Sequence, residues 1–446
     1  MDVVGMYNGV GGTLHDGMYR ARFRPSDFRA RTLDGVADDW PIRLNDLVHY
    51  YEMDERESGI SGLEGDPANP PRGPFPQPQL PIGVLGETMG RGFDKLGWYW
   101  WPCSSAIPSH DYDGRLGCVQ HGMCGLGCGL AVKATPDVTY WPKALRKGAV
   151  LKTWARVSEV TLDSEGRASG ALYFDRDGTL HRQPARVVVV SCNGIGTPRL
   201  LLNSKSKSFP QGLANSSGMV GKNFMHHTQA NIMGTFDQRL DGTTAVPLLV
   251  TSQQFYETDP NRGFVRGYAF LIHNTPGPLG HSGGAAWGAD HHRSMHKRFP
   301  HMIQLTVLGE DLPEENNRVE LDPDVKDSNG IPAARVVYNW SENSLKMLKH
   351  AEQMSRQALE AAGAAEIGTF QHRWSGGHQL GTARMGSDPK RSVVNAWNQA
   401  HDVKNLFIVD GSSFTTVGSV NPTHTIYALA LRTADNIWQR RKEWKS

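Results

Sequence analysis

Residues 376–425 read GGHQLGTARMGSDPKRSVVNAWNQAHDVKNLFIVDGSSFTTVGSVNPTHT, and this stretch decides the fold. It contains a glycine-bracketed histidine, His378, and a short apolar run, Leu406–Val409, that ends in Asp410 and Gly411. An apolar run closed by Asp-Gly predicts a buried strand with a polar group at its carboxyl end. In open α/β sheets, ligands bind outside the carboxyl ends of the strands. The stretch therefore predicts an α/β sheet with a ligand site at this edge.

The last part of the stretch predicts the start of a helix. Asn421, Pro422 and Thr423 precede the segment Ile426–Trp438, whose apolar residues have helical spacing. We expect Asn421 and Thr423 to cap this helix, and its first N–H groups can receive an electron-rich ligand. His424 is a second polar residue at the same place and competes with Asn421 for a role in the site.

Three segments of this region resemble one family. HQLGTARMG, NLFIVDGS and SVNPTHTIYALALRTADNI, in this order, resemble the C-terminal signature of the glucose–methanol–choline (GMC) flavoprotein oxidoreductases. In that family the histidine of HxxGT takes the proton of the substrate hydroxyl, and a His or Asn before the last helix positions the alcohol. By position these residues are His378 and Asn421. The resemblance implies FAD as the cofactor and transfer of a hydride to flavin N5.

The chemistry of these two residues agrees with that assignment. Hydride leaves an alcohol carbon readily only as the hydroxyl loses its proton, and a neutral imidazole such as that of His378 suits that task. The amide of Asn421 can donate a hydrogen bond to the developing alkoxide. By residue type alone, a histidine in a glycine-rich loop is more often structural, so the surrounding motif carries the catalytic hypothesis.

The resemblance also implies a set of FAD contacts. The segment VGGT looks like the second flavin-contacting loop of the family, where glycines let the backbone approach the cofactor. His15 falls near a flavin-proximal histidine of some relatives, and the family meets the adenine with backbone near Val157. The expected cofactor-binding residues are Gly11, Gly12, Thr13, His15, Val157, Asp410, Gly411, Asn421, Pro422 and Thr423.

One unit of the family pattern is not found. Family members begin with a strand, a GxGxxG turn and a helix that hold the FAD pyrophosphate, and no GxGxxG precedes Gly9. Three explanations compete: a sequence truncated at its N-terminus, a separate chain that supplies the unit, and a degenerate homologue that binds no flavin. The alternative to an active enzyme is therefore a homologue that is inactive on its own.

A cysteine motif forms the second informative pattern. Cys118, Cys124 and Cys128 have the spacing C-x5-C-x3-C, and the interleaved glycines let three thiolates converge on one metal. The arrangement resembles the flavin subunit of bacterial FAD-dependent glucose dehydrogenases, where such cysteines hold a 3Fe–4S cluster that passes electrons toward a cytochrome partner. Zinc with His121 or Cys103 as a fourth ligand, and free or disulfide-paired cysteines, are the alternatives.

The resemblance also divides the chain. Residues 1–57, 129–225 and 368–446 are expected to form a discontinuous α/β FAD-binding domain that is incomplete at the N-terminus. Residues 226–367 form an inserted α+β substrate domain built on a mostly antiparallel sheet. Residues 58–128 contain Gly, Pro and the cysteine motif, and are expected near the active site.

Local patterns add four expectations. The β-branched run Arg186–Cys192 predicts a central parallel strand, and Ser341 is expected to cap a long helix that reaches about Ala362. VGKNFMHH, residues 220–227, resembles the family turn VGRNxxDH and marks entry into the substrate domain. The histidine-rich segment Asn274–Pro300 matches no compact ligand set, so a flexible loop is predicted.

Composition excludes several classes of function. The 446 residues carry a net charge of +2 without a basic run, which disfavours nucleic acid as a partner. The sequence contains no apolar stretch of about 18 residues, so no membrane span is predicted. No signal peptide is visible either, and the compartment is left open between cytoplasm and periplasm. Five cysteines at uneven spacing disfavour a disulfide scaffold.

The prediction is an FAD-dependent dehydrogenase acting on a CH–OH group of a sugar, sugar acid or other alcohol. With a cluster at the cysteines, electrons pass to a carrier, such as an acceptor subunit or cytochrome, rather than to oxygen. Two rivals from other classes are a non-enzymatic remnant or partner subunit and a zinc-stapled structural protein. Flavin content tests the first rival, and iron against zinc analysis tests the second.

Overall fold

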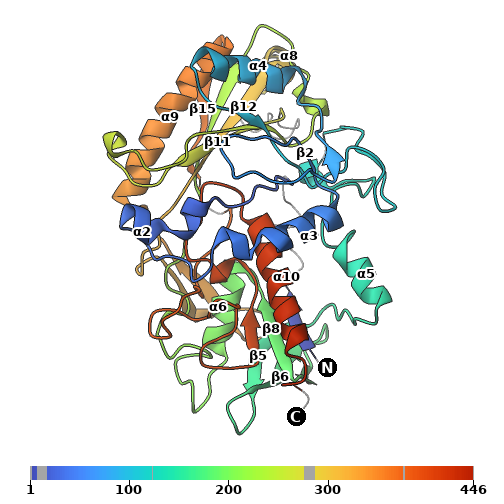
Figure 1. Cartoon of the computed structure of the whole chain (residues 1–446), viewed down its shortest axis with the longest axis vertical. Helices are drawn as coiled ribbons and strands as arrows, with labels where there is room; N and C mark the ends of the chain where they lie inside the picture. The colour runs from blue at the N-terminus through green and yellow to red at the C-terminus, as the bar shows by residue number, and fades with distance from the viewer. Residues whose placement is uncertain (1–2, 8–17, 123, 276–286, 375–376, 445–446) are drawn as a thin grey trace.

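The computed structural model describes residues 3–7, 18–122, 124–275, 287–374 and 377–444. Its elements form two regions, and Figure 1 shows one above the other. Each region has its own large cluster of buried apolar side chains. The first and last elements of the chain lie in the lower region, and the upper region is built largely from the middle of the chain.

A parallel sheet forms the centre of the lower region. Its strand order is β1-β8-β16, and both pairings are parallel. Val187, Val188 and Val190 in the central strand are fully buried, as expected for a strand that is covered on both faces. This confirms the strand predicted over Arg186–Cys192. The strands are β1 (Val3–Tyr7), β8 (Val187–Ser191) and β16 (Leu406–Ile408).

Helices and a second sheet complete the lower region. An antiparallel meander of order β5-β6-β7 lies beside the parallel sheet, and α10 packs against α3. Helix α6 begins directly after β8, so its first turn lies at the carboxyl edge of the parallel sheet. The elements are β5 (Arg156–Leu162), β6 (Ala168–Phe174), β7 (Leu180–Pro184), α3 (Val48–Ser58), α6 (Asn193–Asn203) and α10 (Thr423–Gln439).

An antiparallel sheet of six strands dominates the upper region. Its order is β15-β9-β12-β11-β10-β4, and every neighbouring pair is antiparallel. Strands β9 and β12 pair over eight residues each without a bulge. The strands are β15 (Glu366–Trp374), β9 (Thr228–Thr235), β12 (Met302–Gly309), β11 (Tyr268–His273), β10 (Leu248–Phe255) and β4 (Trp101–Pro102).

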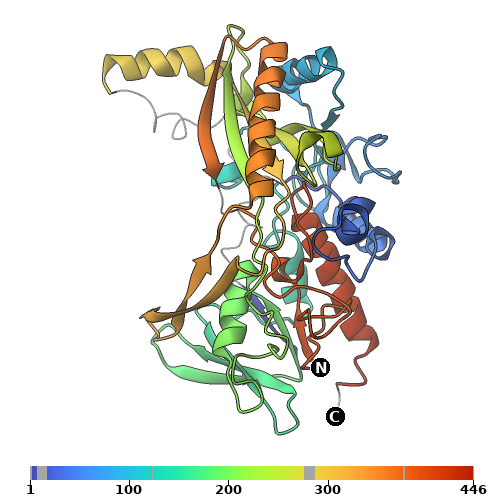
Figure 2. The same ribbon diagram turned by 90° about the vertical axis from the view of Figure 1, so that its left-hand side faces the viewer.

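Two helices cover one face of this sheet, as Figure 2 shows for α9. Helix α9 (Glu342–Ala362) begins where the Ser341 side chain accepts a hydrogen bond from the Ser344 N–H, which confirms the predicted cap. It packs against β9, β12 and α4 (Gly83–Lys95). Burying one leucine such as Leu359 contributes roughly 2 kcal/mol to folding. The apolar side chains between α9 and the sheet therefore hold the helix layer on the sheet.

The remaining elements are short, apart from one helix. The hairpin of β13 and β14 packs against α6, and among the described residues no helix is long and apolar enough to cross a membrane. These elements are α2 (Ala30–Asp34), β2 (Ser61–Gly62), β3 (Gln77–Pro78), α5 (Tyr140–Arg146), α8 (Ala289–Arg298), β13 (Arg318–Lys326) and β14 (Pro332–Val337).

Helix α8 corrects the prediction of a flexible loop over Asn274–Pro300. Residues 276–286 of that segment lie outside the described residues, but Ala289–Arg298 is an exposed helix. Its first turn carries Asp290, and its last turn carries His296, Lys297 and Arg298. Acidic residues near a helix N-terminus and basic residues near its C-terminus favour the helix dipole. The loop prediction considered the histidines of this segment and their spacing, but not the order of its charged residues.

Candidate functional site

The loop that carries His378 crosses from the upper sheet to the lower region. Leu380 and Met225 exchange two backbone hydrogen bonds of 2.9 and 3.0 Å, which fix the loop beside the start of β9. His378 itself has a φ of 61°, in the left-handed region that non-glycine residues rarely occupy. A side chain held in such a conformation commonly belongs to a functional site. The backbone thus aims the imidazole rather than leaving it to a mobile loop.

The structure brings His378 and Asn421 together, as the sequence predicted. The Asn421 Nδ2 atom lies 3.5 Å from His378 Nε2, although 43 residues separate the two along the chain. Asn421 is buried, and its Oδ1 atom accepts no hydrogen bond from the described residues. An amide donor and an imidazole nitrogen therefore face each other across a gap that is long for a direct hydrogen bond.

A third residue of this site was missed. The Nδ1 atom of His227 lies 2.9 Å from His378 Nδ1, and the two rings meet at 84°. Sequence reasoning used residues 220–227 only to mark a boundary between domains. The signal was present, because His227 follows His226 directly before a strand, and a buried histidine needs polar partners.

The capping prediction for the last helix was wrong. Helix α10 begins at Thr423 with Pro422 as the N-cap residue, and no side chain in the described part of the protein caps it. Asn421 and Thr423 therefore leave the N–H groups of the first turn without a side-chain acceptor. Because residues 421–425 are buried, these N–H groups need an electron-rich partner inside the protein.

Asp410 connects the end of β16 to α6. Its carboxylate accepts hydrogen bonds from the backbone N–H groups of Asn193 and Ser412 and from the Thr197 hydroxyl, at 2.5 to 3.1 Å. Burial raises the pKa of Asp410 above its ordinary value, and these donors oppose the rise. Close packing favours glycine at position 411, since a Cβ there would lie 2.4 Å from Leu380 Cδ2 and 2.9 Å from the backbone oxygen of Gln379. Both residues thus shape the sheet edge beside the His378 loop.

His424 does not share the position of Asn421. Its Nε2 atom lies 3.3 Å from the carbonyl oxygen of Tyr51 and 3.6 Å from Asp54, both on α3. Burial lowers the pKa of His424 to about 3, so the ring is neutral. The histidine therefore ties α10 to α3 and is not the rival for the site that its sequence position suggested.

The other residues expected to contact FAD are four near the N-terminus and Val157. Gly11, Gly12, Thr13 and His15 lie outside the described residues. Val157 is a half-buried residue of β5, where it pairs with Tyr173 of β6. Its role at the adenine stays a prediction.

The three cysteines of the motif line one small cavity. Cys118, Cys124 and Cys128 share it with His121 and Lys133, whereas Cys103 is fully buried in the other core cluster. Among the described residues, no group of three or more His, Cys, Asp and Glu side chains is placed as a metal-ligand set. The thiols are thus gathered on one cavity without being arranged as ligands, and all are free cysteines.

The electrostatics of the three thiols differ. Burial, followed by Cys118 and Cys128, raises the pKa of Cys124 to about 11. Burial alone would also raise the pKa of Cys128, but hydrogen bonds from the backbone of Lys133, Val132 and Leu130 outweigh it, and the pKa lies below its ordinary value. Backbone N–H groups that stabilise a thiolate are also suited to a metal-bound sulfur.

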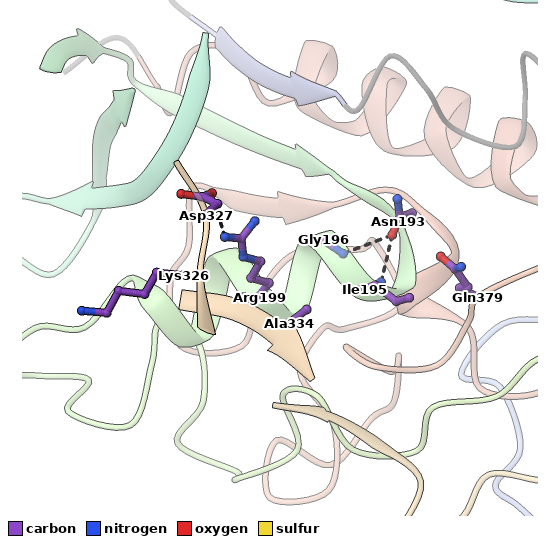
Figure 3. Close-up of a pocket in the computed structure, with 9 residues that line it drawn as sticks. Asn193, Ile195, Gly196, Arg199, Lys326, Asp327, Ala334 and Gln379 are labelled. Atoms are coloured by element: carbon purple, nitrogen blue, oxygen red, sulfur yellow. Dashed lines mark hydrogen bonds and ion pairs between the residues drawn. The ribbon is translucent and has the colours of Figure 1, made fainter. Parts of the chain in front are cut away.

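A larger cavity of about 390 Å³ opens beside α6, and Figure 3 shows its lining. The Arg199 guanidinium reaches Asp327 at 2.9 Å, and the Asn193 side chain accepts hydrogen bonds from the N–H groups of Ile195 and Gly196. His378 and Asn421 do not line this cavity, but Gln379 does. The lining residues are Asn193, Ile195, Gly196, Arg199, Lys326, Asp327, Ala333, Ala334 and Gln379.

Comparison with known proteins identifies the family. An N-terminal and a C-terminal family model, both described as GMC oxidoreductase, match residues 86–229 and 313–430. The chain is 42% identical to a 2-methyl-1,2-propanediol dehydrogenase of Mycolicibacterium austroafricanum, over 98% of this chain and 81% of the relative. It is 30% identical to the fructose dehydrogenase large subunit of Gluconobacter japonicus, over 97% of this chain and 81% of the relative. The chain belongs to the GMC oxidoreductase family.

Solved structures agree on the fold. Pyridoxine 4-oxidase from Mesorbium loti superposes with a TM-score of 0.64 at 15% identity, covering 95% of this chain and 82% of the other. Formate oxidase of Aspergillus oryzae RIB40 gives a TM-score of 0.61 at 13% identity, with 97% and 84% covered. The predicted fold class is thereby confirmed: an α/β FAD-binding part with an inserted part built on a mostly antiparallel sheet.

Family membership implies FAD, and the described residues fit one end of it. The first turn of α10 offers buried N–H groups that no side chain caps, and Asn421 Oδ1 is buried without a partner among the described residues. A helix N-terminus attracts an electron-rich group, and the pyrimidine edge of a flavin is one. The start of α10 would hold this edge, and Asp410 and Gly411 shape the adjoining sheet edge.

Proposed function

We propose that the chain oxidises a CH–OH group of a small alcohol or polyol, with His378 as the proton acceptor. The observation that carries the proposal is the convergence of the His378 imidazole and the Asn421 amide at the uncapped start of α10. Bound FAD would accept the hydride, which carries the two electrons removed from the substrate. The protein groups would supply positioning and proton transfer.

The two side chains divide the work on the hydroxyl. The substrate oxygen would lie beside Asn421 Nδ2 and His378 Nε2, which are 3.5 Å apart, and its O–H would donate a hydrogen bond to the imidazole. Asn421 Nδ2 would donate to the same oxygen and stabilise it as negative charge develops. A general base in this role is worth about 10²- to 10⁴-fold in rate.

The sheet above the site supports a polyol as substrate. On the face of β9 and β12 opposite the α9 layer lie Asn231, Gln304 and Thr306, and both Gln304 and Thr306 donate to the Asn231 oxygen, at 3.3 and 2.6 Å. Gln229 continues this row and reaches the His378 loop, since a Cβ on Gly377 would lie 3.7 Å from its Nε2 atom. Such amides and hydroxyls can bind further hydroxyl groups. Two relatives are named for a diol and a sugar.

The cysteine cavity supports a second part of the proposal. Three thiols on one cavity, one of them stabilised as a thiolate by backbone N–H groups, are a donor set that suits a 3Fe–4S cluster at Cys118, Cys124 and Cys128. Such a cluster would pass electrons to an acceptor subunit or cytochrome rather than to oxygen. Two relatives are named as parts of dehydrogenases, a large subunit and a flavoprotein, which supports a partner.

The domain division and the remaining FAD contacts belong to this proposal. The two apolar clusters support the assignment of residues 226–367 to a substrate domain and of 1–57, 129–225 and 368–446 to an FAD-binding domain. Val157 would then lie on the adenine side of the cofactor. The competing proposal is a homologue that needs a partner to bind FAD, and FAD titration of the purified chain separates the two.

Replacing His378 tests the proposal. In FAD-loaded protein, His378→Ala should slow flavin reduction by a diol or sugar by about 10²-fold or more, because the hydroxyl loses its base. Flavin binding should be unchanged, as followed by the absorption of the bound cofactor. His401→Ala is a matched control, since this histidine contacts Ser392 and should reduce at the wild-type rate. Equal rates for His378→Ala and wild type would end the assignment.

A further inference from the structure

The hydrogen bonds around His227 form an ordered chain. His227 Nε2 lies 2.9 Å from the carbonyl oxygen of Gly418, and His227 Nδ1 lies 2.9 Å from Nδ1 of His378. On the far side of the second ring, His378 Nε2 faces Asn421 Nδ2 at 3.5 Å. The chain thus runs from a backbone carbonyl through two imidazoles to the place proposed for the substrate.

The carbonyl at one end determines where every proton in this chain lies. A carbonyl oxygen only accepts, so His227 Nε2 must carry a hydrogen. In a neutral imidazole the other nitrogen is then an acceptor, so His227 Nδ1 receives its hydrogen bond from His378 Nδ1–H. The neutral His378 consequently has its lone pair on Nε2, the nitrogen that faces Asn421.

His227 is held neutral, as this logic requires. The side chain is fully buried, and burial, followed by His378, lowers the pKa of His227 well below its ordinary value. The titratable groups that act on it are His378 and His226, and both are histidines that would repel a second positive charge. His226 points its own Nδ1 to the His227 carbonyl and its ring toward Tyr338.

The accepting carbonyl is itself fixed. Gly418 has a φ of 62°, and a Cβ there would lie 3.3 Å from Phe23 and from the Tyr256 hydroxyl. The next residue, Ser419, donates its N–H to Tyr256 and its hydroxyl to the Gly267 carbonyl. The loop therefore cannot turn its carbonyl away from His227 without losing these bonds.

We propose that His227 is a positioning residue that selects the tautomer of His378, so that Nε2 is the atom that receives the substrate proton. His227 touches neither substrate nor cofactor in this role and acts through the Nδ1–Nδ1 hydrogen bond. The inference rests on the proposed function of His378 for its catalytic meaning, but the tautomer itself is a property of the protein without substrate.

Nitrogen NMR of histidine-labelled protein tests the tautomer directly. The His378 signals, assigned by their loss in His378→Asn, should show a protonated Nδ1 and an unprotonated Nε2 above the imidazole pKa. His227→Leu, which removes the acceptor, should shift His378 toward Nε2–H, whereas His227→Gln retains an acceptor oxygen and should keep the native tautomer. His226→Leu is the matched control and should also keep it. The wild-type spectrum alone can overturn the proposal, because a hydrogen on Nε2 of His378 would contradict it. The test therefore does not depend on the folding of any variant.

Kinetics supply the second test. His227→Leu should lower kcat for alcohol oxidation by about 10²-fold relative to His227→Gln with little change in KM, because a base in the wrong tautomer cannot accept the proton. The acid limb of the pH profile should move to lower pH, since the lost acceptor no longer stabilises protonated His378. Equal kcat and equal acid limbs in the Leu and Gln variants would contradict the proposal. If His378 has the expected tautomer but the protein does not oxidise alcohols, the proposed function would be wrong and the tautomer assignment would stand.

Discussion

The proton site and the cysteine cavity are built in opposite ways. His227, His378 and Asn421 come from three segments that lie far apart in the sequence, and their positions are set by a strand, a strained loop and a helix start. The cysteines come from one stretch of eleven residues, Cys118–Cys128, in which Cys124–Leu126 form a single 3-10 turn. The first site has its donors and acceptors in place within the described residues, whereas the second gathers thiols without arranging them as ligands.

This difference shows what each site needs in order to form. Folding of the two regions brings the proton site together, because the hydrogen bonds between its side chains connect the start of the upper sheet to α10. A short cysteine loop can complete its geometry when a metal binds, since metal binding and local folding are coupled. Substitutions should therefore separate the two sites cleanly, and the following predictions use that separation.

Among the substitutions that compare these two sites, the largest effect is expected at Asn421. Asn421→Leu removes the donor to the developing alkoxide and should slow flavin reduction by about 10²- to 10³-fold, the value of one such donor in other enzymes. Asn421→His restores an N–H donor and should recover a large part of the rate. Stopped-flow flavin reduction reports on the proton site, and iron analysis of the same samples reports on the cysteine cavity. An iron content that falls together with the rate of flavin reduction would contradict the independence of the two sites.

An intermediate effect is expected at the cysteine cavity. Cys124→Ser should lower iron affinity by more than about 100-fold, since even outer-shell partners of a metal are worth about 10- to 100-fold. Substrate should still reduce the flavin, but transfer to an external electron acceptor should slow. Cys192→Ser, at the start of α6 and outside this cavity, is the control. Equal iron in both variants, or zinc in place of iron, would refute the cluster.

The last prediction concerns stability beside the proton site. Burial raises the pKa of Asp311 to about 7, although the hydroxyls of Ser344 and Tyr338 and the backbone of His226 oppose the rise. Because the folded-state pKa exceeds the unfolded one, near 4, the folded protein binds more protons between these values. Its stability should therefore fall as pH rises from about 4 to 7, by at most about 1.4 kcal/mol per pH unit.

Asp311→Asn removes this ionisation and should flatten that part of the stability profile. Urea denaturation of wild type and variant across the pH range measures the difference in slope. The other buried ionisable groups, such as Asp54 and His424, are present in both proteins and cancel in the comparison. Parallel profiles would show that Asp311 does not titrate in this window. The His378 tautomer should be unchanged in the variant.

Elements with a strong local signal could be predicted from the sequence. The buried strand over 186–192 and the capped helix after Ser341 formed as expected, because hydrophobic period and cap chemistry agree with the packing. The α10 cap was mispredicted, and so was the part of the predicted 274–300 loop that forms the helix Ala289–Arg298. At α10, the Asn421 amide nitrogen faces His378 instead of the helix start, and in α8 an acidic first turn and a basic last turn favour the helix.

The candidate site was predictable only where a motif named its residues. His378 and Asn421 lie in the family signature, and the structure places them side by side. His227 could not be paired with His378 from the sequence, because the contact depends on how β9 meets the His378 loop through Met225 and Leu380. His424 was a false rival for the same reason, since only the fold shows that its ring faces α3.

The most direct test of the central claim is the reduction of FAD bound to this chain. The purified protein is loaded with FAD, made anaerobic and mixed with a diol or sugar while the absorption of the flavin is followed. We predict that FAD binds and that its oxidised band disappears when substrate is added. A chain that takes up no FAD, or whose bound FAD stays oxidised with every alcohol tested, would contradict the account.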